Sequence, residues 1–243
     1  MILDLSYLRE NIPLSLQYFE SIDSTSLYLK RCIKDGTDVP GLVIASSQTD
    51  GQGRVGRSFY SPEDTGLYLT FAFSSEKFSC EDLTPRVALA VSSAIDEVFS
   101  VQTGIKWVND IYLNFRKVSG VLCQKVNDYY LIGIGINVEA PRFIPDELKQ
   151  RFGSICVTCE KEQYTKLILA LYRNLIFYSD LSKEKVRSFF LDKCIHINKT
   201  VSIEFDHGVL EGKCVGIGDD FSLLVEIDGE TRAFDSGFMS LKI

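Results

Sequence analysis

The chain has 243 residues, of which 45% are hydrophobic and 24% are charged, as in ordinary soluble globular proteins. Its 33 acidic residues outnumber its 26 basic ones and give a net charge of −7, which argues against broad nucleic-acid binding through a basic surface. Residues 1–22 lack the pattern of a secretory signal, and no run approaches the roughly 18 apolar residues of a membrane span. We therefore expect a cytoplasmic protein that binds neither nucleic acid nor membranes.

The first two-thirds of the chain mixes helix and strand patterns. Residues 24–34 (STSLYLKRCIK) begin with hydroxyl residues suited to helix capping and predict a helix. The amphipathic pattern over 81–100 predicts a second helix. The order of these elements and the strands indicates an α+β fold with a mixed or antiparallel sheet. The predicted strands, rich in β-branched and aromatic residues, lie at 41–47, 66–73, 105–108, 118–126 and 129–138.

The patterning changes near residue 194. Before that point, residues 160–192 form the longest helical region, and its apolar stripe is interpreted as core: Leu167, Leu171, Leu175 and Tyr178. After it, short strands alternate with turns that contain Asp and Gly. The sequence thus predicts a larger domain over residues 1–194 and a small β-barrel over residues 195–243.

Seven scattered cysteines are typical of free thiols in a reducing compartment. Cys156 and Cys159 form a CVTC motif, but a zinc site would need a second pair or suitably spaced histidines. The only histidines are His196 and His207. We interpret the two thiols as incidental rather than as a metal or redox site.

Residues 51–57 (GQGRVGR) concentrate three glycines and two arginines between two predicted strands. The segment has neither the spacing of a P-loop nor the strand-to-helix context of a dinucleotide-binding motif. Its glycines allow backbone motion, and Arg54 and Arg57 carry planar groups suited to phosphate or carboxylate. From this segment alone, a solvated loop is an equally good interpretation.

Two later stretches bear on that choice. Residues 106–120 (KWVNDIYLNFRKVSG) place two lysines around an Asn-Asp pair, although surface charges and a plain turn would give the same pattern. The single tryptophan, Trp107, is equally consistent with a core position. The strand LIGIGINV at 131–138 contains two glycines, which mark either the close approach of a ligand or a bulge.

Together with DSTS at 23–26, these stretches resemble the biotin protein ligase family. The family pattern has a DSTN-like start, a GRGRxGR loop followed by an aromatic residue and Ser-Pro, a KWPND…KxxGIL segment and a GIGINV strand. All four motifs have counterparts here in the same order, over about residues 20–140. Four ordered matches are more specific than any single one. The β-rich end of the chain resembles the SH3-like C-terminal domain of that family.

The chain departs from the family pattern at four motif positions. Ser26 replaces a usual Asn, and Val108 replaces the Pro of KWPND. Gln52 replaces a frequent Arg and leaves the loop one cation short. Phe59 replaces a common Trp and offers less area for stacking on a purine. None of these changes removes an obvious catalytic charge.

The resemblance implies a monofunctional, adenylate-forming ligase with a core similar to class II aminoacyl-tRNA synthetases. Biotin and ATP, with Mg²⁺, would give biotinyl-5′-AMP and pyrophosphate. A lysine of a biotin carboxyl carrier domain, as in acetyl-CoA carboxylase, would then attack the mixed anhydride. Such chemistry needs cations near the α-phosphate rather than a protein nucleophile, and no Ser-His-Asp or Cys-His set is evident. A homodimer is compatible with the resemblance.

The resemblance also implies residue roles. Lys117 would bridge the biotin carboxylate and the α-phosphate, and Arg54 would contact phosphate. Asp110 would act near the phosphates or Mg²⁺, or help the incoming lysine lose its proton, with a purely structural role as the alternative. Mg²⁺ is expected to come with ATP rather than to occupy a site made by protein alone. The Gly/Arg segment would close over biotinyl-AMP and exclude water.

The residues that the resemblance assigns to ligands form two overlapping sets. The biotin set is Ser24, Thr25, Ser26, Gln48, Gly51, Gln52, Gly53, Arg54, Tyr68, Lys117, Gly120 and Gly133. The ATP set is Arg54, Arg57, Phe59, Lys106, Asn109, Asp110, Lys117 and Asn137.

Other functions stay open at this point. A lipoate-type ligase shares the adenylation chemistry, but a dithiolane ring would leave the polar groups of Ser24, Thr25 and Gln48 without partners. A biotin-sensing DNA-binding regulator would have the same core, yet only about 22 residues precede DSTS, too few for a three-helix DNA-binding module. A non-catalytic biotin-binding protein would not need the phosphate-facing cations.

Overall fold

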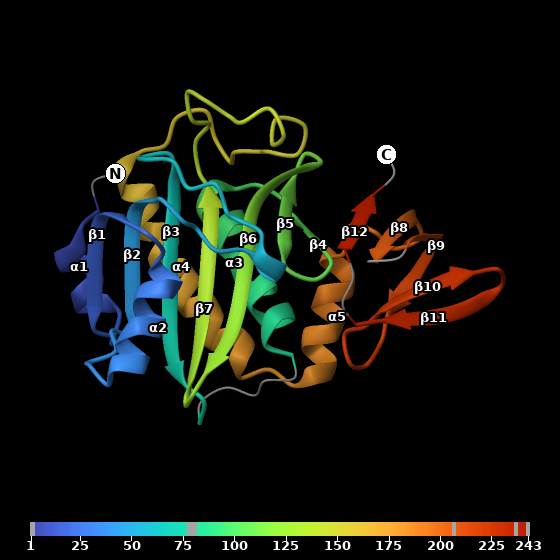
Figure 1. Ribbon diagram of the computed structural model, residues 1–243, viewed down its shortest axis with the longest axis horizontal. Helices are drawn as coiled ribbons and strands as arrows, with labels where there is room; N and C mark the ends of the chain where they lie inside the picture. Colours follow the sequence, from blue (N-terminus) through green and yellow to red (C-terminus); the bar gives the residue numbers. More distant parts are fainter. Residues whose placement is uncertain (1–2, 77–81, 206–207, 236–237, 242–243) are drawn as a thin grey trace.

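The computed structural model describes residues 3–76, 82–205, 208–235 and 238–241. A large mixed sheet carries helices on both faces and is followed by a smaller C-terminal sheet (Figure 1). The expected α+β class is confirmed.

Most predicted elements lie close to their expected positions, but the sequence did not predict the helix at Leu5–Asn11 or the strand at Leu16–Ile22. The helices are α1 (Leu5–Asn11), α2 (Thr25–Asp35), α3 (Leu83–Phe99), α4 (Lys161–Ser179) and α5 (Lys183–Lys193), with one 3-10 turn at Arg54–Gly56. The larger sheet contains β1 (Leu16–Ile22), β2 (Leu42–Gln48), β3 (Gly66–Ser74), β4 (Gly104–Lys106), β5 (Asp110–Leu113), β6 (Arg116–Val126) and β7 (Tyr129–Asn137). The smaller sheet contains β8 (Thr200–Phe205), β9 (Gly208–Ile217), β10 (Leu223–Ile227), β11 (Glu230–Phe234) and β12 (Phe238–Leu241).

The larger sheet has the strand order β1-β2-β3-β7-β6-β5-β4. Only β1 and β2 pair in parallel, and the other neighbours are antiparallel. In Figure 1, α3 and α4 lie behind the sheet and α2 lies in front of it. Along β7, Ile132, Ile134 and Ile136 belong to the main core. Because side chains alternate along a strand, Gly133 and Gly135 face the opposite side, toward α2.

Two sequence predictions about this body were wrong in detail. The helical region 160–192 is two helices, because the Ser182 hydroxyl begins α5 by accepting a hydrogen bond from the Lys185 backbone N–H. Arg86 helps to end α4, since its Nη1 donates to the Tyr178 carbonyl at 2.5 Å and to the Leu181 carbonyl, just beyond the helix, at 2.8 Å. The strand predicted at 105–108 ends at Lys106, and Trp107 instead turns into the core with 6% of its surface exposed. The predicted apolar stripe on α4 is buried as expected.

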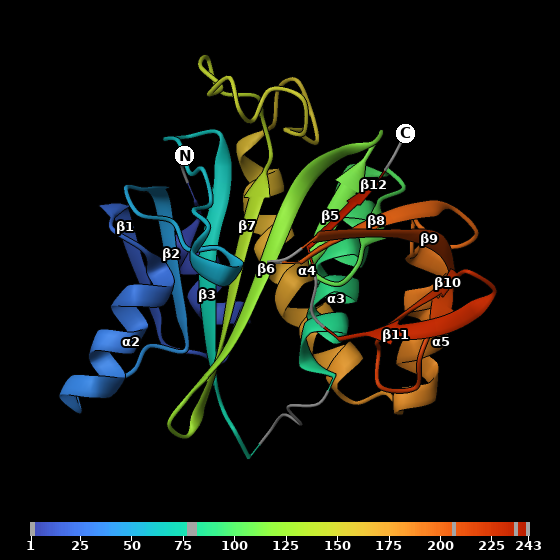
Figure 2. The same ribbon diagram turned by 45° about the vertical axis from the view of Figure 1, so that its right-hand side comes forward.

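All five C-terminal strands that the sequence predicts are present. They form an antiparallel sheet in the order β11-β10-β9-β8-β12. The sheet lies beside α5 (Figure 2), where Arg187 Nε donates to the Ile217 carbonyl at 3.0 Å. The C-terminal sheet is therefore fixed to the preceding part of the chain by a direct contact with α5.

The described residues contain no disulfide, no helix able to span a membrane and no cluster of metal ligands. Its six cysteines there form no disulfide. No helix among the described residues has both the length and the apolar character needed to cross a membrane. Within the same residues, no three His, Cys, Asp or Glu side chains gather in an arrangement that could hold a metal ion.

Candidate functional site

The start of α2 places hydroxyl groups over the middle of the large sheet. Ser24 caps the helix, with its Oγ 3.5 Å from the Leu27 backbone N. The next two residues, Thr25 and Ser26, therefore occupy the first helical turn, where both are buried. The helix packs against β2, β3 and β7 and so directs these hydroxyls at the sheet.

Four residues form what we call the polar cluster: Thr25, Ser26, Gln48 and Thr70. The Thr70 hydroxyl lies 2.8 Å from the Thr25 hydroxyl and 2.9 Å from that of Ser26. Gln48 Oε1 accepts hydrogen bonds from the Thr25 backbone N at 2.9 Å and from its Oγ1 at 3.2 Å. Gln48 Nε2 donates to Ser61 Oγ at 2.9 Å. These bonds fix the cluster before any ligand arrives.

Glycines form the floor beside the polar cluster. A side chain at Gly133 would place its Cβ 2.9 Å from Ser26 Oγ, closer than atoms normally approach. Gly120 and Gly135 are paired neighbours on β6 and β7, and the Phe59 ring lies over both. A Cβ at Gly135 would collide with that ring. The floor therefore needs glycine wherever a helix, a ring or a ligand approaches the sheet.

The Gly/Arg segment (residues 51–57) and the two residues that follow it fold back as a compact turn. Gly53 N donates to the Arg57 carbonyl and Phe59 N donates to the Gly51 carbonyl, each at 2.7 Å. Gln52 is paired with Ser58, and its Nε2 donates to the Asp50 carbonyl at 2.8 Å. The segment is thus more ordered than the solvated loop that was an open alternative.

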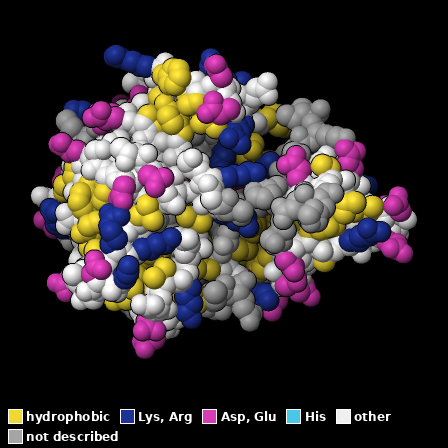
Figure 3. Space-filling model, in the orientation of Figure 1, with side chains coloured by type: hydrophobic (Ala, Val, Ile, Leu, Met, Phe, Trp, Pro, Cys, Tyr) yellow, Lys and Arg dark blue, Asp and Glu magenta, His cyan; other side chains and the backbone are white. Residues whose placement is uncertain are grey.

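Positive charge gathers next to the glycine floor. Arg54 Nη1 donates to Asn109 Oδ1 at 3.2 Å, and Lys117 Nζ donates to Asp110 Oδ1 at 2.7 Å. Lys117 Nζ also lies 5.9 Å from the centre of the Phe59 ring. Figure 3 shows Lys and Arg side chains gathered in the middle of this face, beside the hollow that separates the main body from the C-terminal sheet.

Lys106 adds a further cation to the same region. Burial lowers the pKa of its ammonium group, and the nearby charges of Lys117 and Arg57 lower it further, while Asp110 opposes the shift. Its Nζ lies 5.8 Å from the centre of the Tyr112 ring. A site crowded with cations in this way favours an anionic ligand such as a phosphate.

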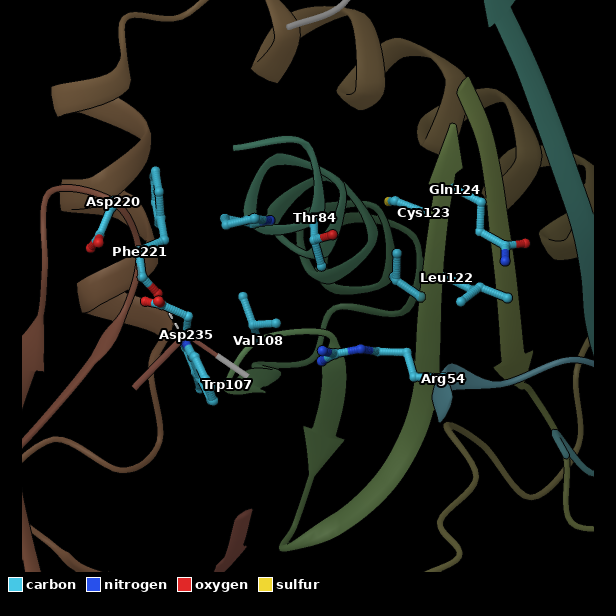
Figure 4. Close-up of a pocket in the computed structure, with 12 residues that line it drawn as sticks. Arg54, Thr84, Trp107, Val108, Leu122, Cys123, Gln124, Asp220, Phe221 and Asp235 are labelled. Carbon is cyan, nitrogen blue, oxygen red and sulfur yellow. Dashed lines mark hydrogen bonds between the residues drawn. The ribbon is translucent and has the colours of Figure 1, made fainter. Parts of the chain in front are cut away.

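A cavity of about 410 Å³ opens next to these cations. In Figure 4, Arg54 extends into it from the Gly/Arg segment toward Val108 and Trp107, and Leu122 of β6 lies on the other side. Residues of the C-terminal sheet and its loops, among them Asp220, form the opposite wall. The Gly/Arg segment therefore borders both the glycine floor and a cleft between the two sheets.

The structure brings most of the predicted site residues together on one face of the sheet, and several of them already have hydrogen-bond partners within the protein. Asn137 is buried, and its Nδ2 donates to the Gly153 carbonyl at 3.0 Å and to the Lys117 carbonyl at 3.4 Å. The Tyr68 hydroxyl donates to the Pro62 carbonyl at 3.0 Å, and burial raises its pKa. Gln48 is held within the polar cluster.

Sequence reasoning missed Thr70 and Ser61. Thr70 is a fully buried hydroxyl residue inside the apolar run LYLTFAF of β3, and that interruption was the available signal. Ser61 follows the Gly/Arg segment, and its Oγ donates to the Phe59 carbonyl at 3.0 Å while accepting from Gln48. It therefore links the polar cluster to the segment that carries Arg54.

Comparison with known proteins assigns this arrangement to a family. Residues 18–138, which contain all four motifs, match the model of the biotin/lipoate A/B protein ligase family. The biotin protein ligase from Aquifex aeolicus in complex with biotin and ATP superposes with a TM-score of 0.80 at 30% identity, over 94% of this chain and 98% of that one. The chain belongs to the biotin/lipoate A/B protein ligase family.

Two curated members of the ligase family extend the similarity over most of the chain. The bifunctional ligase/repressor BirA of Bacillus subtilis is 27% identical over 224 residues, covering 87% of this chain and 69% of that protein. The biotin–[acetyl-CoA-carboxylase] ligase of Mycobacterium tuberculosis is 24% identical over 224 residues, covering 88% of this chain and 84% of that protein. The sequence resemblance to this family is therefore confirmed.

Proposed function

We propose that this protein is a biotin protein ligase that activates biotin with ATP and transfers it to a lysine of a biotin carboxyl carrier protein or domain. One observation carries the proposal: the polar cluster, the Arg54 guanidinium and the Lys117 ammonium group lie on one face of the sheet. That face belongs to a chain 30% identical to a ligase solved with biotin and ATP.

The polar cluster and glycine floor would bind biotin. The ureido ring of biotin has two N–H groups and a carbonyl, and each needs a partner once it is buried. Hydroxyl groups can both donate and accept, so the side chains of Ser24, Thr25 and Ser26 suit this ring. The lack of side chains at Gly120 and Gly133 would let the bicycle approach the strands, and Gly51, Gln52, Gly53 and Tyr68 complete the proposed set.

The cations would hold the two reacting anions together. A biotin carboxylate oxygen forms a bond to the α-phosphorus of ATP, and the bond to the pyrophosphate oxygen breaks. Lys117 would contact both the carboxylate and the α-phosphate, and Arg54 would contact phosphate. The proposed ATP set also includes Arg57, Phe59, Lys106, Asn109 and Asn137.

Asp110 supplies the carboxylate nearest to these cations. A carboxylate oxygen is a ligand that Mg²⁺ accepts, so Asp110 fits an ion that arrives with ATP. When bound, Mg²⁺ would supply charge neutralisation on the phosphates. In the second step Asp110 would take a proton from the incoming lysine, whose nitrogen would then bond to the biotinyl carbonyl carbon as AMP leaves. Its ion pair with Lys117 would orient both groups.

Other parts of the proposal concern the setting of this chemistry. We infer that residues 1–194 form the ligase domain, related to class II aminoacyl-tRNA synthetases, and residues 195–243 an SH3-like barrel. The carrier is inferred from the name of the M. tuberculosis relative. Cysteines without disulfides in the described residues support a cytoplasmic location. The net charge of −7 supports a protein that does not bind DNA.

Biotin-dependent pyrophosphate exchange is the main assay that separates this function from the alternative functions. Biotin should promote exchange of labelled pyrophosphate into ATP, and lipoate should not. A lipoate-type ligase would show the reverse preference. A non-catalytic biotin sensor would bind biotin without exchange, and gel-shift titration with biotinyl-AMP present would reveal a DNA-binding regulator. Gel filtration over a concentration series shows whether the protein is a monomer or a homodimer.

A further inference from the structure

Trp107, the only tryptophan, donates hydrogen bonds from both its backbone N–H and its indole N–H to residues that follow α5. The Trp107 backbone N donates to His196 Nε2 at 2.7 Å, and its indole Nε1 donates to the Phe221 carbonyl at 2.8 Å. Next to it, Ile195 N donates to the Ile105 carbonyl at 3.1 Å. The junction with the C-terminal sheet thus fixes the segment directly after β4.

His196 is suited to this contact because it is fully buried and neutral. Burial, together with the charges of Lys106 and Lys199, lowers its pKa to about 3. Above that pH the ring keeps a lone pair on Nε2 with which to accept the Trp107 N–H, and its proton sits on Nδ1. Among the described residues Nδ1 has no hydrogen-bond partner. Among the described residues, the His196 ring therefore makes its hydrogen bond to the Trp107 backbone N–H.

The segment that His196 holds leads directly to the cations. Asn109, two residues beyond Trp107, accepts a hydrogen bond from Arg54 at 3.2 Å through Oδ1 and donates through Nδ2 to the Val121 carbonyl at 3.0 Å. Val121 N in turn donates to the Asn109 carbonyl at 2.9 Å. Asp110 follows and pairs with Lys117. One continuous chain of contacts therefore runs from His196 to Arg54 and Lys117.

We propose that His196 is a positioning residue for adenylation: through Trp107 it sets the segment that orients Arg54 and Asp110. The proposal rests on the proposed ligase function. Without an acceptor at position 196, the buried Trp107 N–H would lose its partner, and the segment would shift to find another. A displacement of about 1 Å in a positioning group can lower a reaction rate by up to about a hundredfold.

Two substitutions test the acceptor itself. His196→Gln can place its Oε1 near the position of Nε2, whereas His196→Asn is too short to reach Trp107. We expect His196→Asn to lower kcat for biotin-dependent pyrophosphate exchange about tenfold or more, with the Kd for biotin within about twofold of wild type. His196→Gln should recover most of the lost rate. Equal rates for the two variants would overturn the proposal.

The fluorescence of Trp107 gives a readout that does not depend on activity. Because it is the only tryptophan, its emission and its quenching by acrylamide report on this segment alone. His196→Asn should shift the emission to longer wavelength and increase quenching, and His196→Gln should not. Ile203→Ala is the matched control, because it removes buried packing from β8, a strand to which neither of the two Trp107 hydrogen bonds goes.

The outcomes separate this inference from the proposed function. If wild type shows no biotin-dependent exchange, the ligase function fails, while the fluorescence pair still tests the hold on Trp107. If exchange occurs and Ile203→Ala lowers it as much as His196→Asn does, general destabilisation explains the loss and the positioning role is wrong. Unchanged Trp107 emission in His196→Asn would also contradict it.

Discussion

The polar cluster and the Gly/Arg segment line the same face, yet they are built in opposite ways. The polar cluster is made of buried side chains that bond one another across α2, β2 and β3. The Gly/Arg segment is held mainly by backbone hydrogen bonds within residues 51–59, and its Arg54 side chain extends toward a cleft. The first is organised before binding, so the ordering of its groups costs little when biotin arrives.

The Gly/Arg segment has less to hold it without a ligand. Three glycines add a backbone entropy cost to any ordered state, and a phosphate between the cations would offset that cost. The contrast suggests that the two halves divide the work, with recognition in the rigid half and charge stabilisation in the half that responds to the ligand.

Lys117→Gln should show the largest effect. It removes the one cation proposed to touch both carboxylate and phosphate, and charge-assisted contacts in a dry site are worth about 1.5–3 kcal/mol each or more. We expect pyrophosphate exchange to fall at least a hundredfold. Lys125→Gln, the same change at an exposed position of β6, is the control and should be nearly silent. Exchange within threefold of wild type in Lys117→Gln would refute the assignment.

Arg54→Gly should separate retention of the adenylate from its formation. Loss of the guanidinium should weaken closure and release biotinyl-AMP about tenfold to a hundredfold faster, since every 1.4 kcal/mol lost is a factor of ten. Released adenylate should biotinylate lysines of a bystander protein in the absence of carrier. Arg232→Gly, in β11, should not cause such labelling. Tight retention of the adenylate in Arg54→Gly would show that another group holds it.

Thr70→Val tests the role of the polar cluster in binding biotin. The change keeps the shape of the side chain but leaves the Thr25 and Ser26 hydroxyls without their shared partner, at a cost of about 1–3 kcal/mol. The KM for biotin should rise about tenfold and the KM for ATP should stay constant. Thr231→Val, at an exposed position of β11, is the matched control. If the two KM values rise together, the cluster does not select biotin.

The smallest expected effect is a change in amide exchange in the unmodified protein. Biotinyl-AMP should slow exchange across residues 48–60, because the ligand would stabilise the ordered state of the Gly/Arg segment. The first turns of α2 should be protected with or without ligand. Unchanged amide exchange across residues 48–60 would refute closure of the Gly/Arg segment over biotinyl-AMP. Arg54 and Arg57 would then be static phosphate contacts.

Sequence patterns predicted much of this molecule because the decisive information was local. Runs rich in β-branched and aromatic residues gave the strands, and the period near 3.6 gave the helices and the buried stripe on α4. Lys117 and Asp110 lie seven residues apart on paired strands, so their ion pair also follows from a local hairpin. The break between α4 and α5 was missed because it depends in part on Arg86, a residue far away in the chain.

By itself, the sequence determined the elements, the four family motifs and the charges that adenylation needs. Only the tertiary structure decided that Thr70 joins Thr25 and Ser26, across 45 and 44 residues, and that His196 holds Trp107 across 89. Such bonds depend on how separate elements are brought together by burial of the core, and a periodic pattern carries no record of which distant polar group will meet another.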